Sequence, residues 1–246
     1  GVYEVGSVMK LFTIATGLEM NKITVKDTID ATRPLMLANH TINDVEKLRR
    51  VVTVPEILIE SSNIGAATVA LKIGGEKQRD FFNRFGFFKT AGLELPEHGR
   101  PLLPQKWRDV TTATAGYGYG VALTPVHIVA ATAALVNGGI YNAPSLLAKR
   151  PSDEKIGKRV ISKKTSDIMR GIMRQVVISG SGRKANVPGF EVGGKTGSAQ
   201  KLVNGKYVKN TLRTSFVSAF PMDNPQYVLM VMLDAPKGLK ETHYFN

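Results

Sequence analysis

The spacing of apolar and polar residues divides the chain into a helical first part and a strand-forming last part. Residues 11–18 are apolar on nearly every side, which predicts a buried helix beginning near Ser7. Between residues 54 and 85 apolar side chains recur at helical spacing, with breaks at residues 61–63 and 74–75. These pieces predict a compact lobe of helices.

Two further helices are predicted after this lobe. Thr124 precedes Pro125 in the order expected of a capping residue and a first helical position, and two glycines end that segment at residues 138–139. Residues 162–178 carry apolar side chains on one side and predict an amphipathic helix. Loops are expected at residues 24–41, with a short hairpin, and 94–108, and the glycine-rich residues 116–120 predict a turn that lines a cleft.

Strand signals gather at the end of the chain. Residues 191–202, 212–220 and 227–233 have strand length and are separated by short connections, Asn204-Gly205 and residues 221–225, which implies antiparallel neighbours. We expect the N-terminal helix to pack on this sheet because no other segment is apolar enough to cover it. The predicted fold class is α+β, a central antiparallel β-sheet covered by helices with an all-helical lobe.

Composition narrows the class of protein further. The chain has 246 residues, of which 43% are hydrophobic and 22% charged, as is typical of a globular domain, and no apolar run approaches the ~18 residues that span a bilayer. There is no cysteine, which excludes thiol chemistry, and the four histidines have no metal-ligand spacing, so no metal or other cofactor is expected. Candidate chemistry begins within ten residues of the first residue, so we expect a fragment that is incomplete at both ends.

The chain is strongly basic. Its 33 Lys and Arg residues exceed its 20 Asp and Glu residues, for a formal net charge of +13. Such a balance raises nucleic acid, anionic lipid or an acidic polymer as partners. The basic residues are scattered and do not alternate with aromatic ones, which favours a solvated surface and no nucleic-acid partner.

A serine and a lysine share one helical turn at the start of the first helix. Ser7 and Lys10 stand three positions apart, so their side chains lie on one helix face. A buried lysine loses solvation, which lowers its pKa and lets it act as a base on the serine. The same spacing recurs at residues 152/155, 181/184 and 198/201, but only Ser7 is followed by a long apolar helix.

A second motif, Ser61-x-Asn63, interrupts the helical lobe and occurs once in the chain. At a junction between helices, Ser61 is able to present a hydroxyl and Asn63 an amide to one side of a cleft. The hydroxyl suits the relay of a proton, and the amide suits a hydrogen bond to a substrate amide.

A third motif, Lys195-Thr196-Gly197, also occurs once and lies on a predicted strand. Lys195 and Thr196 offer a positive charge and a hydroxyl to a carboxylate. Gly197 has no side chain, so an extended substrate is able to approach and pair with the strand edge. The backbone N–H groups of Ser7 and Ser198 are candidates for an oxyanion hole around the attacked carbonyl.

These three motifs, in this order, resemble the transpeptidase domain of class B penicillin-binding proteins. The matching stretches are residues 3–7, 61–65, 116–120, 124–125, 187–189 and 193–201. Residues 228–238 and 242–246 are most similar to the division-specific, penicillin-binding protein 3 branch. Val5 stands where the family usually has proline, and Ser198 replaces its more common threonine.

The resemblance implies a serine D,D-transpeptidase of the penicillin-binding or serine β-lactamase-like fold. Its single domain covers residues 1–246, with the helical lobe inserted at about 50–135 and the strands at about 190–235. Ser7, Lys10, Ser61, Asn63 and Lys195 are then the expected catalytic residues. Thr196, Gly197 and Ser198 bind the substrate carboxylate and backbone.

The same resemblance implies where the protein works and on what. Ser7 forms an acyl-enzyme with a peptidoglycan stem peptide ending in two D-alanines, an amine of a second stem resolves it, and a β-lactam acylates the same serine. The family needs no cofactor. It lies on the periplasmic side of the bacterial inner membrane, held by an N-terminal transmembrane helix that this sequence lacks, and it meets other division and cell-wall synthesis proteins through regions outside this sequence.

Three alternatives stay open from sequence. A class A β-lactamase needs a glutamate between the second and third motifs, and Glu94 and Glu97 lie there without the expected asparagine four positions on. A catalytically idle penicillin sensor or division scaffold would share every motif. A nucleic-acid-binding module would follow from charge alone.

Overall fold

A computed structural model describes residues 1–148, 157–203 and 206–237. The helices are η1 (Gly6–Val8), α1 (Met9–Glu19), α2 (Val54–Ile59), α3 (Asn63–Ile73), α4 (Gly75–Arg84), α5 (Asp109–Tyr117), α6 (Pro125–Val136), α7 (Lys163–Ser179) and η3 (Arg183–Ala185). The strands are β1 (Thr28–Asp30), β2 (Leu35–Leu37), β3 (His40–Ile42), β4 (Val51–Thr53), β5 (Ile140–Tyr141), β6 (Lys158–Arg159), β7 (Gly193–Val203), β8 (Lys206–Phe220) and β9 (Tyr227–Asp234). The α+β class is confirmed.

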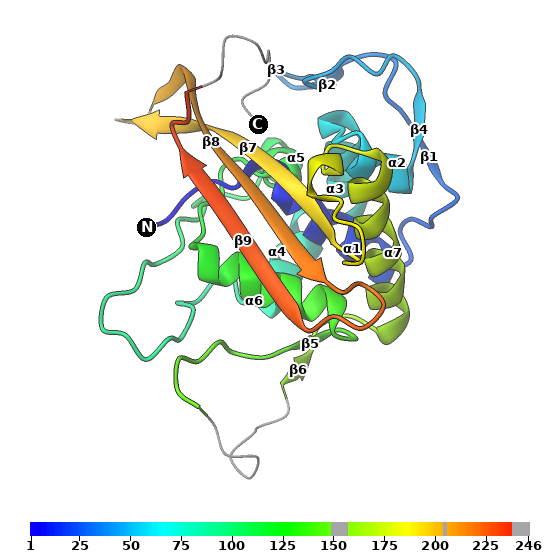
Figure 1. Cartoon of the computed structure of the whole chain (residues 1–246). Helices are drawn as coiled ribbons and strands as arrows, with labels where there is room; N and C mark the ends of the chain where they lie inside the picture. The colour runs from blue at the N-terminus through cyan, green and yellow to red at the C-terminus, as the bar shows by residue number, and fades with distance from the viewer. Residues whose placement is uncertain (149–156, 204–205, 238–246) are drawn as a thin grey trace.

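The main sheet is formed by the three long strands at the end of the chain (Figure 1). Their order is β7-β8-β9 and both pairings are antiparallel, as predicted. The expected Asn204-Gly205 turn lies outside the described residues. Three two-stranded sheets accompany the main one: β1 with β4, the predicted hairpin of β2 with β3, and β5 with β6.

Helices cover one face of the main sheet. α7 packs against β7, and α6 packs against β8 and β9, while every second residue of β9 on the other face is exposed. The expectation that the N-terminal helix covers the sheet is wrong. Only its preceding turn, η1, packs closely on β7; α1 is apolar all round because α3, α4, α5 and α7 surround it. The predicted helical lobe, residues 50–135, includes most of α6, but α6 packs on β8 and β9. The extent of the lobe stays a prediction.

Helix starts follow the capping rules that the sequence suggested. Thr53 and Glu56 form a capping box at α2, and Thr124 and His127 form one at α6, each with proline in the first turn. α5 was not expected, because only residues 116–117 of it were assigned, to a turn, and residues 109–115 carried no prediction. None of the helices in the described part of the chain combines the length and hydrophobicity that a bilayer crossing requires.

Candidate active site

The turn that carries Ser7 is held by backbone contacts rather than by side chains. Gly6 has φ +54°, and a Cβ atom on it would overlap the backbone of Ser198 on β7. Gly118 follows α5 with φ +104° and packs in the same way on the carbonyl of Gly6. Ser7 is thereby fixed where η1 runs into α1, next to the backbone of Ser198.

Lys10 and Lys195 converge on Ser61 from two different elements. Lys10 lies in the first turn of α1, and its Nζ donates to the Ser61 carbonyl at 2.5 Å and lies 3.2 Å from the Ser61 Oγ. Lys195, on β7, places its Nζ 3.0 Å from the same Oγ. The Ser61 hydroxyl therefore joins the two amines that the sequence motifs predicted separately.

Both lysines are fully buried, and burial changes their protonation. Each side chain has a relative exposure of 0%. Burial lowers the pKa of Lys10 well below its usual range; the charge of Lys195 lowers it further, and Asp44 partly opposes the shift. Burial lowers the pKa of Lys195 to about 7. Burial thus favours the neutral amine of Lys10, which is the state that a general base needs.

Ser61 forms the joint between two helices. It follows the C-cap residue of α2, has φ +59°, and is followed by Ser62, which caps α3. A positive φ is uncommon for a residue with a side chain and marks a position that the surrounding structure enforces. Here it lies between two helix ends, where the Ser61 hydroxyl meets both lysines.

A buried acid holds this joint in place. The Asp44 carboxylate accepts hydrogen bonds from the Ser62 hydroxyl at 3.0 and 3.1 Å and from the Ile64 N–H at 2.9 Å. The neighbouring Asn43 carbonyl accepts a 2.9 Å bond from Asn63 Nδ2. The second motif is thus fastened to the connection between β3 and β4.

The third motif lies on β7, which has a free edge among the described strands. Ser198 is exposed and Thr196 partly exposed, so both hydroxyls are accessible. Gly197 is buried, and a Cβ there would overlap the Val5 carbonyl and the Ser215 hydroxyl. Glycine is therefore required at position 197 for packing against the chain before Ser7. Substrate binding by Gly197 stays a prediction.

Three polar residues belong to this region although sequence reasoning did not select them. Ser181 Oγ lies 3.3 Å from Lys195 Nζ and accepts a 2.9 Å bond from Thr196 Oγ1. Asp44 holds the second motif. Glu4 accepts bonds from the Gly120 N–H and the Tyr207 hydroxyl, and its other oxygen is buried without a partner within the described residues. Burial raises the pKa of Glu4.

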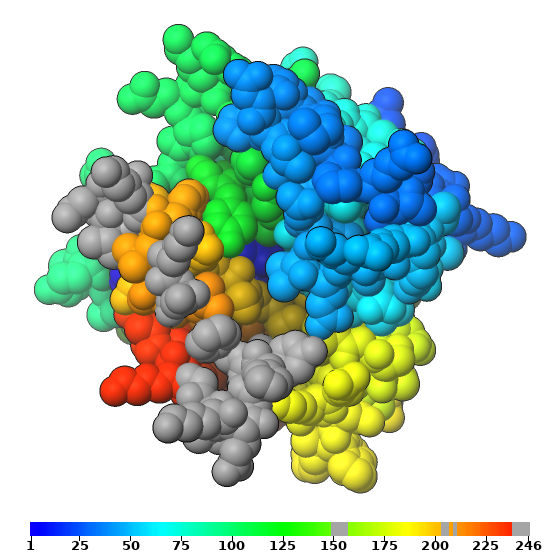
Figure 2. Space-filling model, turned by 90° about the horizontal axis from the view of Figure 1, so that it is seen from above, coloured from blue at the N-terminus to red at the C-terminus, as the bar shows by residue number. Residues whose placement is uncertain are grey.

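Three of the predicted residues thus come together, and the elements that carry them border a surface depression. Figure 2 shows it between the β7 and β8 strands and residues of the β3 to α3 region, with atoms from the start of the chain at its bottom. Lys10, Ser61 and Lys195 form one hydrogen-bonded cluster. Ser7 stands three positions before Lys10, and Asn63 stands two positions after Ser61. Within the described part of the chain the Ser7 hydroxyl makes no hydrogen bond and the Asn63 side-chain carbonyl accepts none. Grouped His, Asp and Glu side chains fit to hold a metal ion are absent from the described ranges.

Comparison with known proteins identifies the family that carries this arrangement. The model of the penicillin-binding protein transpeptidase domain matches residues 1–245. The chain belongs to that family. A probable peptidoglycan D,D-transpeptidase FtsI from Caulobacter vibrioides is 39% identical to this chain. Stage V sporulation protein D from Bacillus subtilis is 35% identical. Both class B relatives align with 96% of this chain. The predicted family is confirmed.

Solved structures agree with this class B assignment. The transpeptidase domain of penicillin-binding protein 3 from Burkholderia pseudomallei superposes with a TM-score of 0.91 at 30% identity, covering 96% of this chain and 72% of that one. Penicillin-binding protein 3 from Mycobacterium tuberculosis, in complex with aztreonam, superposes with a TM-score of 0.88 at 26% identity, covering 96% and 57%. The chain spans 42% of the Caulobacter relative and 39% of the Bacillus relative.

Proposed function

We propose that this domain cross-links peptidoglycan as a serine D,D-transpeptidase, with Ser7 as the nucleophile. The observation that carries the proposal is the convergence of two buried amines, Lys10 and Lys195, on the Ser61 hydroxyl at the start of the helix that bears Ser7. Perturbed titrating groups that meet in a depression are typical of catalytic sites. The relatives named as peptidoglycan D,D-transpeptidases support the same reaction.

In the first half-reaction Ser7 Oγ attacks the carbonyl between the two terminal D-alanines of a stem peptide. Lys10 in its neutral form takes the hydroxyl proton, and the backbone N–H groups of Ser7 and Ser198 stabilise the developing oxyanion. The leaving amine of the last D-alanine receives a proton through Ser61, which contacts both lysines. The products are an ester on Ser7 and free D-alanine.

In the second half-reaction an amine of another stem peptide attacks this ester. Its nitrogen forms the new amide bond, its proton passes to Lys10, and Ser7 is regenerated as a hydroxyl. Thr196 and Ser198, both accessible on β7, hold the substrate carboxylate with Lys195 providing positive charge. Asn63 hydrogen-bonds the peptide, which extends along the free edge of β7.

A β-lactam follows the same first step and forms a slowly hydrolysed adduct on Ser7. The complexes of Mycobacterium tuberculosis penicillin-binding protein 3 with aztreonam and ampicillin support this part of the proposal. The FtsI relatives further support a role in septal wall synthesis, at the periplasmic side of the inner membrane, together with other division proteins. The same proposal includes attachment of the protein to the inner membrane by an N-terminal anchor.

Mass spectrometry after incubation with benzylpenicillin tests the nucleophile. Lys10 is the first basic residue, so trypsin releases residues 1–10 as one peptide that contains Ser7 and no other serine. We expect one adduct on this peptide and none in Ser7→Ala. Ser179→Ala, an exposed hydroxyl at the end of α7, is the matched control and keeps the adduct. An adduct on any other tryptic peptide would contradict the assignment.

Two further assays separate the rival activities. Steady turnover of a chromogenic cephalosporin would indicate a β-lactamase, whereas the proposal expects a single stoichiometric burst. Glu94, a candidate for the β-lactamase glutamate, bonds instead to the Ser145 hydroxyl and the Leu146 N–H. A penicillin sensor would form the adduct but would not exchange D-alanine on a stem-peptide thioester; the transpeptidase does both.

A further inference from the structure

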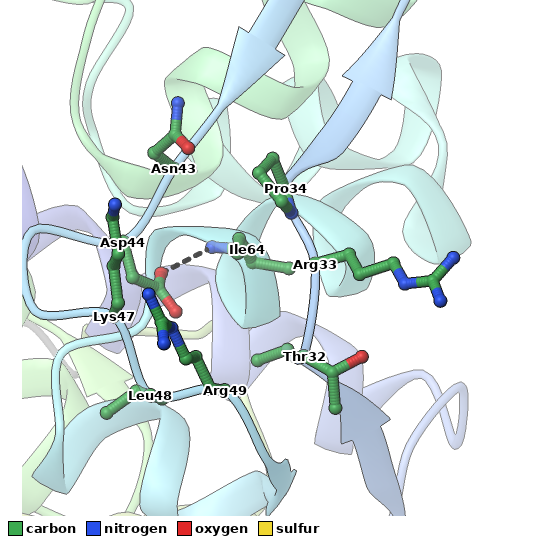
Figure 3. A pocket seen from close by; sticks show the side chains of 10 residues that line it. Thr32, Arg33, Pro34, Asn43, Asp44, Lys47, Leu48, Arg49 and Ile64 are labelled. Carbon is green, nitrogen blue, oxygen red and sulfur yellow. Dashed lines mark hydrogen bonds between the residues drawn. The ribbon is translucent and has the colours of Figure 1, made fainter.

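A basic pocket lies next to the second motif, between the segment before β2 and the connection from β3 to β4. It has a volume of about 220 Å³ and is lined by Ala31, Thr32, Arg33, Pro34, Asn43, Asp44, Lys47, Leu48, Arg49 and Ile64. Figure 3 shows residues 32–34 on one side and Lys47 and Arg49 on the other, near the Asp44 carboxylate. None of these lining residues takes part in the proposed acylation.

The charge of this pocket is unbalanced. Arg33, Lys47 and Arg49 are exposed and form no ion pair within the described residues, whereas Arg50 next to them is paired with Glu56 and Glu60. The single acid of the pocket, Asp44, is already engaged by Ser62 and the Ile64 N–H. Lys47 and Arg49 therefore face one occupied carboxylate, which favours an anionic ligand.

The pocket is also connected to the reaction centre through the backbone that forms it. Asn43 and Asp44 fasten Asn63 and Ser62, the two residues that follow Ser61. Lys195 reaches the Ser61 hydroxyl from β7 at 3.0 Å. The carboxylate of the donor peptide is assigned to β7, so the basic pocket is left for a different part of the substrate.

We propose that this pocket binds a carboxylate of the second peptidoglycan strand, whose amine resolves the acyl-enzyme. The inference rests on the proposed function and assigns a binding site to its second half-reaction. Lys47 and Arg49 contribute the charge; Thr32 on the facing wall donates its hydroxyl proton to Asp30 and lines the pocket without binding the carboxylate. Arg33 extends away from the pocket in Figure 3 and adds only long-range attraction.

The test separates binding of the second strand from acylation. The probe is the amine-bearing tripeptide L-alanyl-γ-D-glutamyl-L-lysine in two forms. In one form the α-carboxylate of the glutamyl residue is free, and in the other it is an amide. The assay measures transfer of the acyl group of a stem-peptide thioester to the lysine amine of each form. We expect the wild-type protein to prefer the carboxylate form by a factor on the order of 10, which is typical of a hydrogen bond to a charged group. In the double variant Lys47→Gln, Arg49→Gln this preference disappears.

The matched control removes the same charge elsewhere. Lys158 and Lys164 are exposed and far along the chain, and Lys158→Gln with Lys164→Gln is expected to keep the preference. Formation of the benzylpenicillin adduct, which needs no second strand, reports whether the variants fold. Equal use of both tripeptides by the wild-type protein, or an undiminished preference in the Lys47/Arg49 variant, would overturn the inference.

A binding measurement keeps this outcome distinct from failure of the proposed function. Calorimetric titration of the unacylated protein with both tripeptides needs no chemistry at Ser7, so it remains informative if no adduct forms. We expect tighter binding of the carboxylate form, weakened by salt and lost in the Lys47/Arg49 variant. Tighter binding of inorganic phosphate than of the tripeptide would overturn the assignment to a peptide carboxylate.

Discussion

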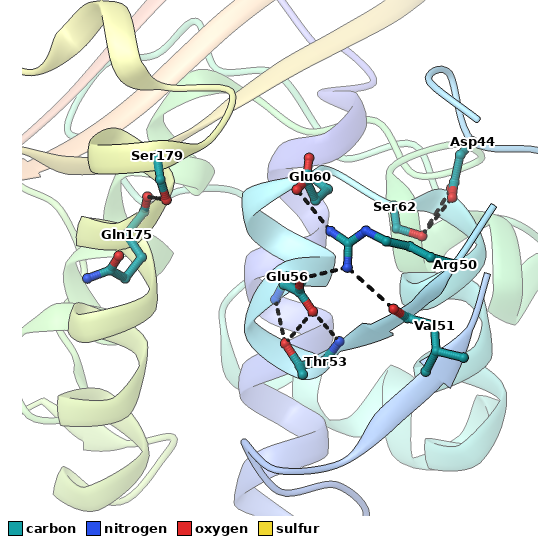
Figure 4. A network of polar contacts seen from close by, with 9 residues as sticks. All are labelled: Asp44, Arg50, Val51, Thr53, Glu56, Glu60, Ser62, Gln175 and Ser179. Atoms are coloured by element: carbon teal, nitrogen blue, oxygen red, sulfur yellow. Dashed lines mark hydrogen bonds and ion pairs between the residues drawn. The ribbon is translucent and has the colours of Figure 1, made fainter. Parts of the chain in front are cut away.

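Two polar clusters flank α2 and use charge in opposite ways. On its exposed side Arg50 bridges Glu56 and Glu60 at 2.7 and 3.1 Å, and Glu56 also caps the helix through Thr53 (Figure 4). Just beyond its last turn, two buried amines, Lys10 and Lys195, share the Ser61 hydroxyl without an ion pair among the described residues. In the first cluster the positive and negative charges are paired and exposed to water. In the second cluster the two amines are buried and have no acidic partner in hydrogen-bond contact among the described residues.

The difference shows which cluster serves stability and which serves chemistry. An exposed ion pair contributes roughly 0–1 kcal/mol because water and salt screen it. Burying two like charges instead costs free energy, and a folded protein retains such an arrangement where the shifted protonation is useful. Variants that remove a charged or polar group from one cluster at a time test this interpretation.

Lys10→Met should have the largest effect on activity. It removes the amine but keeps a flexible side chain of similar length, so the benzylpenicillin adduct should form 10² to 10⁴-fold more slowly, the usual contribution of a general base. The melting temperature should not fall, because a desolvated amine is replaced by an apolar group. Stopped-flow acylation and calorimetry measure the two quantities, and acylation within threefold of wild type would contradict the base assignment.

Asp44→Ala should affect both stability and acylation. The Ser62 hydroxyl and the Ile64 N–H lose their acceptor in a buried site, which should lower the free energy of unfolding by about 1–3 kcal/mol. Acylation should slow by roughly tenfold or more as Ser61 shifts. Asp44→Asn keeps an acceptor oxygen and should lie between wild type and alanine; an alanine variant with full stability would refute the fastening role.

The buried cluster should also give the protein a pH-dependent stability. The pKa of Lys195 is about 7 in the folded protein and near 10.5 when unperturbed. Between these values the unfolded chain binds more protons, so the free energy of unfolding should rise with pH by up to about 1.4 kcal/mol per unit. Below pH 7 Lys195 becomes protonated in both states and its contribution to the slope vanishes.

Urea unfolding at pH 7 and pH 9 measures this slope. Lys195→Met should reduce it, since the titrating amine is gone, and the Lys10 amine should leave a remaining slope of the same sign. Equal slopes in wild type and Lys195→Met would show that Lys195 titrates normally in the folded state.

Arg50→Gln should have the smallest effect. Its two ion pairs are exposed, so the loss should stay below about 1 kcal/mol and shrink with added salt. Acylation should remain within twofold of wild type. A loss of acylation comparable to that of Lys10→Met would erase the distinction between the two clusters.

The reaction centre was predictable as a set of motifs but not as a geometry. Ser-x-x-Lys spacing alone selected nothing, and only the ordered triple singled out Ser7, Ser61 and Lys195. Asp44 escaped notice because it lies in a connection 18 positions before Ser62, where no local pattern marks it. Ser181 matched the serine–lysine spacing with Lys184, but its contact in the structure is to Lys195 instead.

The fold was predictable where local chemistry and packing agree. The capping residue Thr124 marked the start of α6 correctly. α5 was missed because its threonines and Gly116 are poor helix formers; close packing on α3 compensates, and a Cβ at Gly116 would press on Ala70. The apolar surface of α1 indicated burial correctly but could not identify its neighbours, because burial among helices and burial on a sheet leave the same pattern.

The stacked glycines beneath Ser7 limit how this protein can evolve. Gly118, Gly6 and the Ser198 backbone touch without intervening side chains, so any larger residue at either glycine forces apart three distant segments at once. Single substitutions at these glycines therefore cannot reshape the backbone around Ser7 without moving all three segments. We expect sequence variation near Ser7 to be tolerated in neighbouring side chains and not at Gly6 or Gly118.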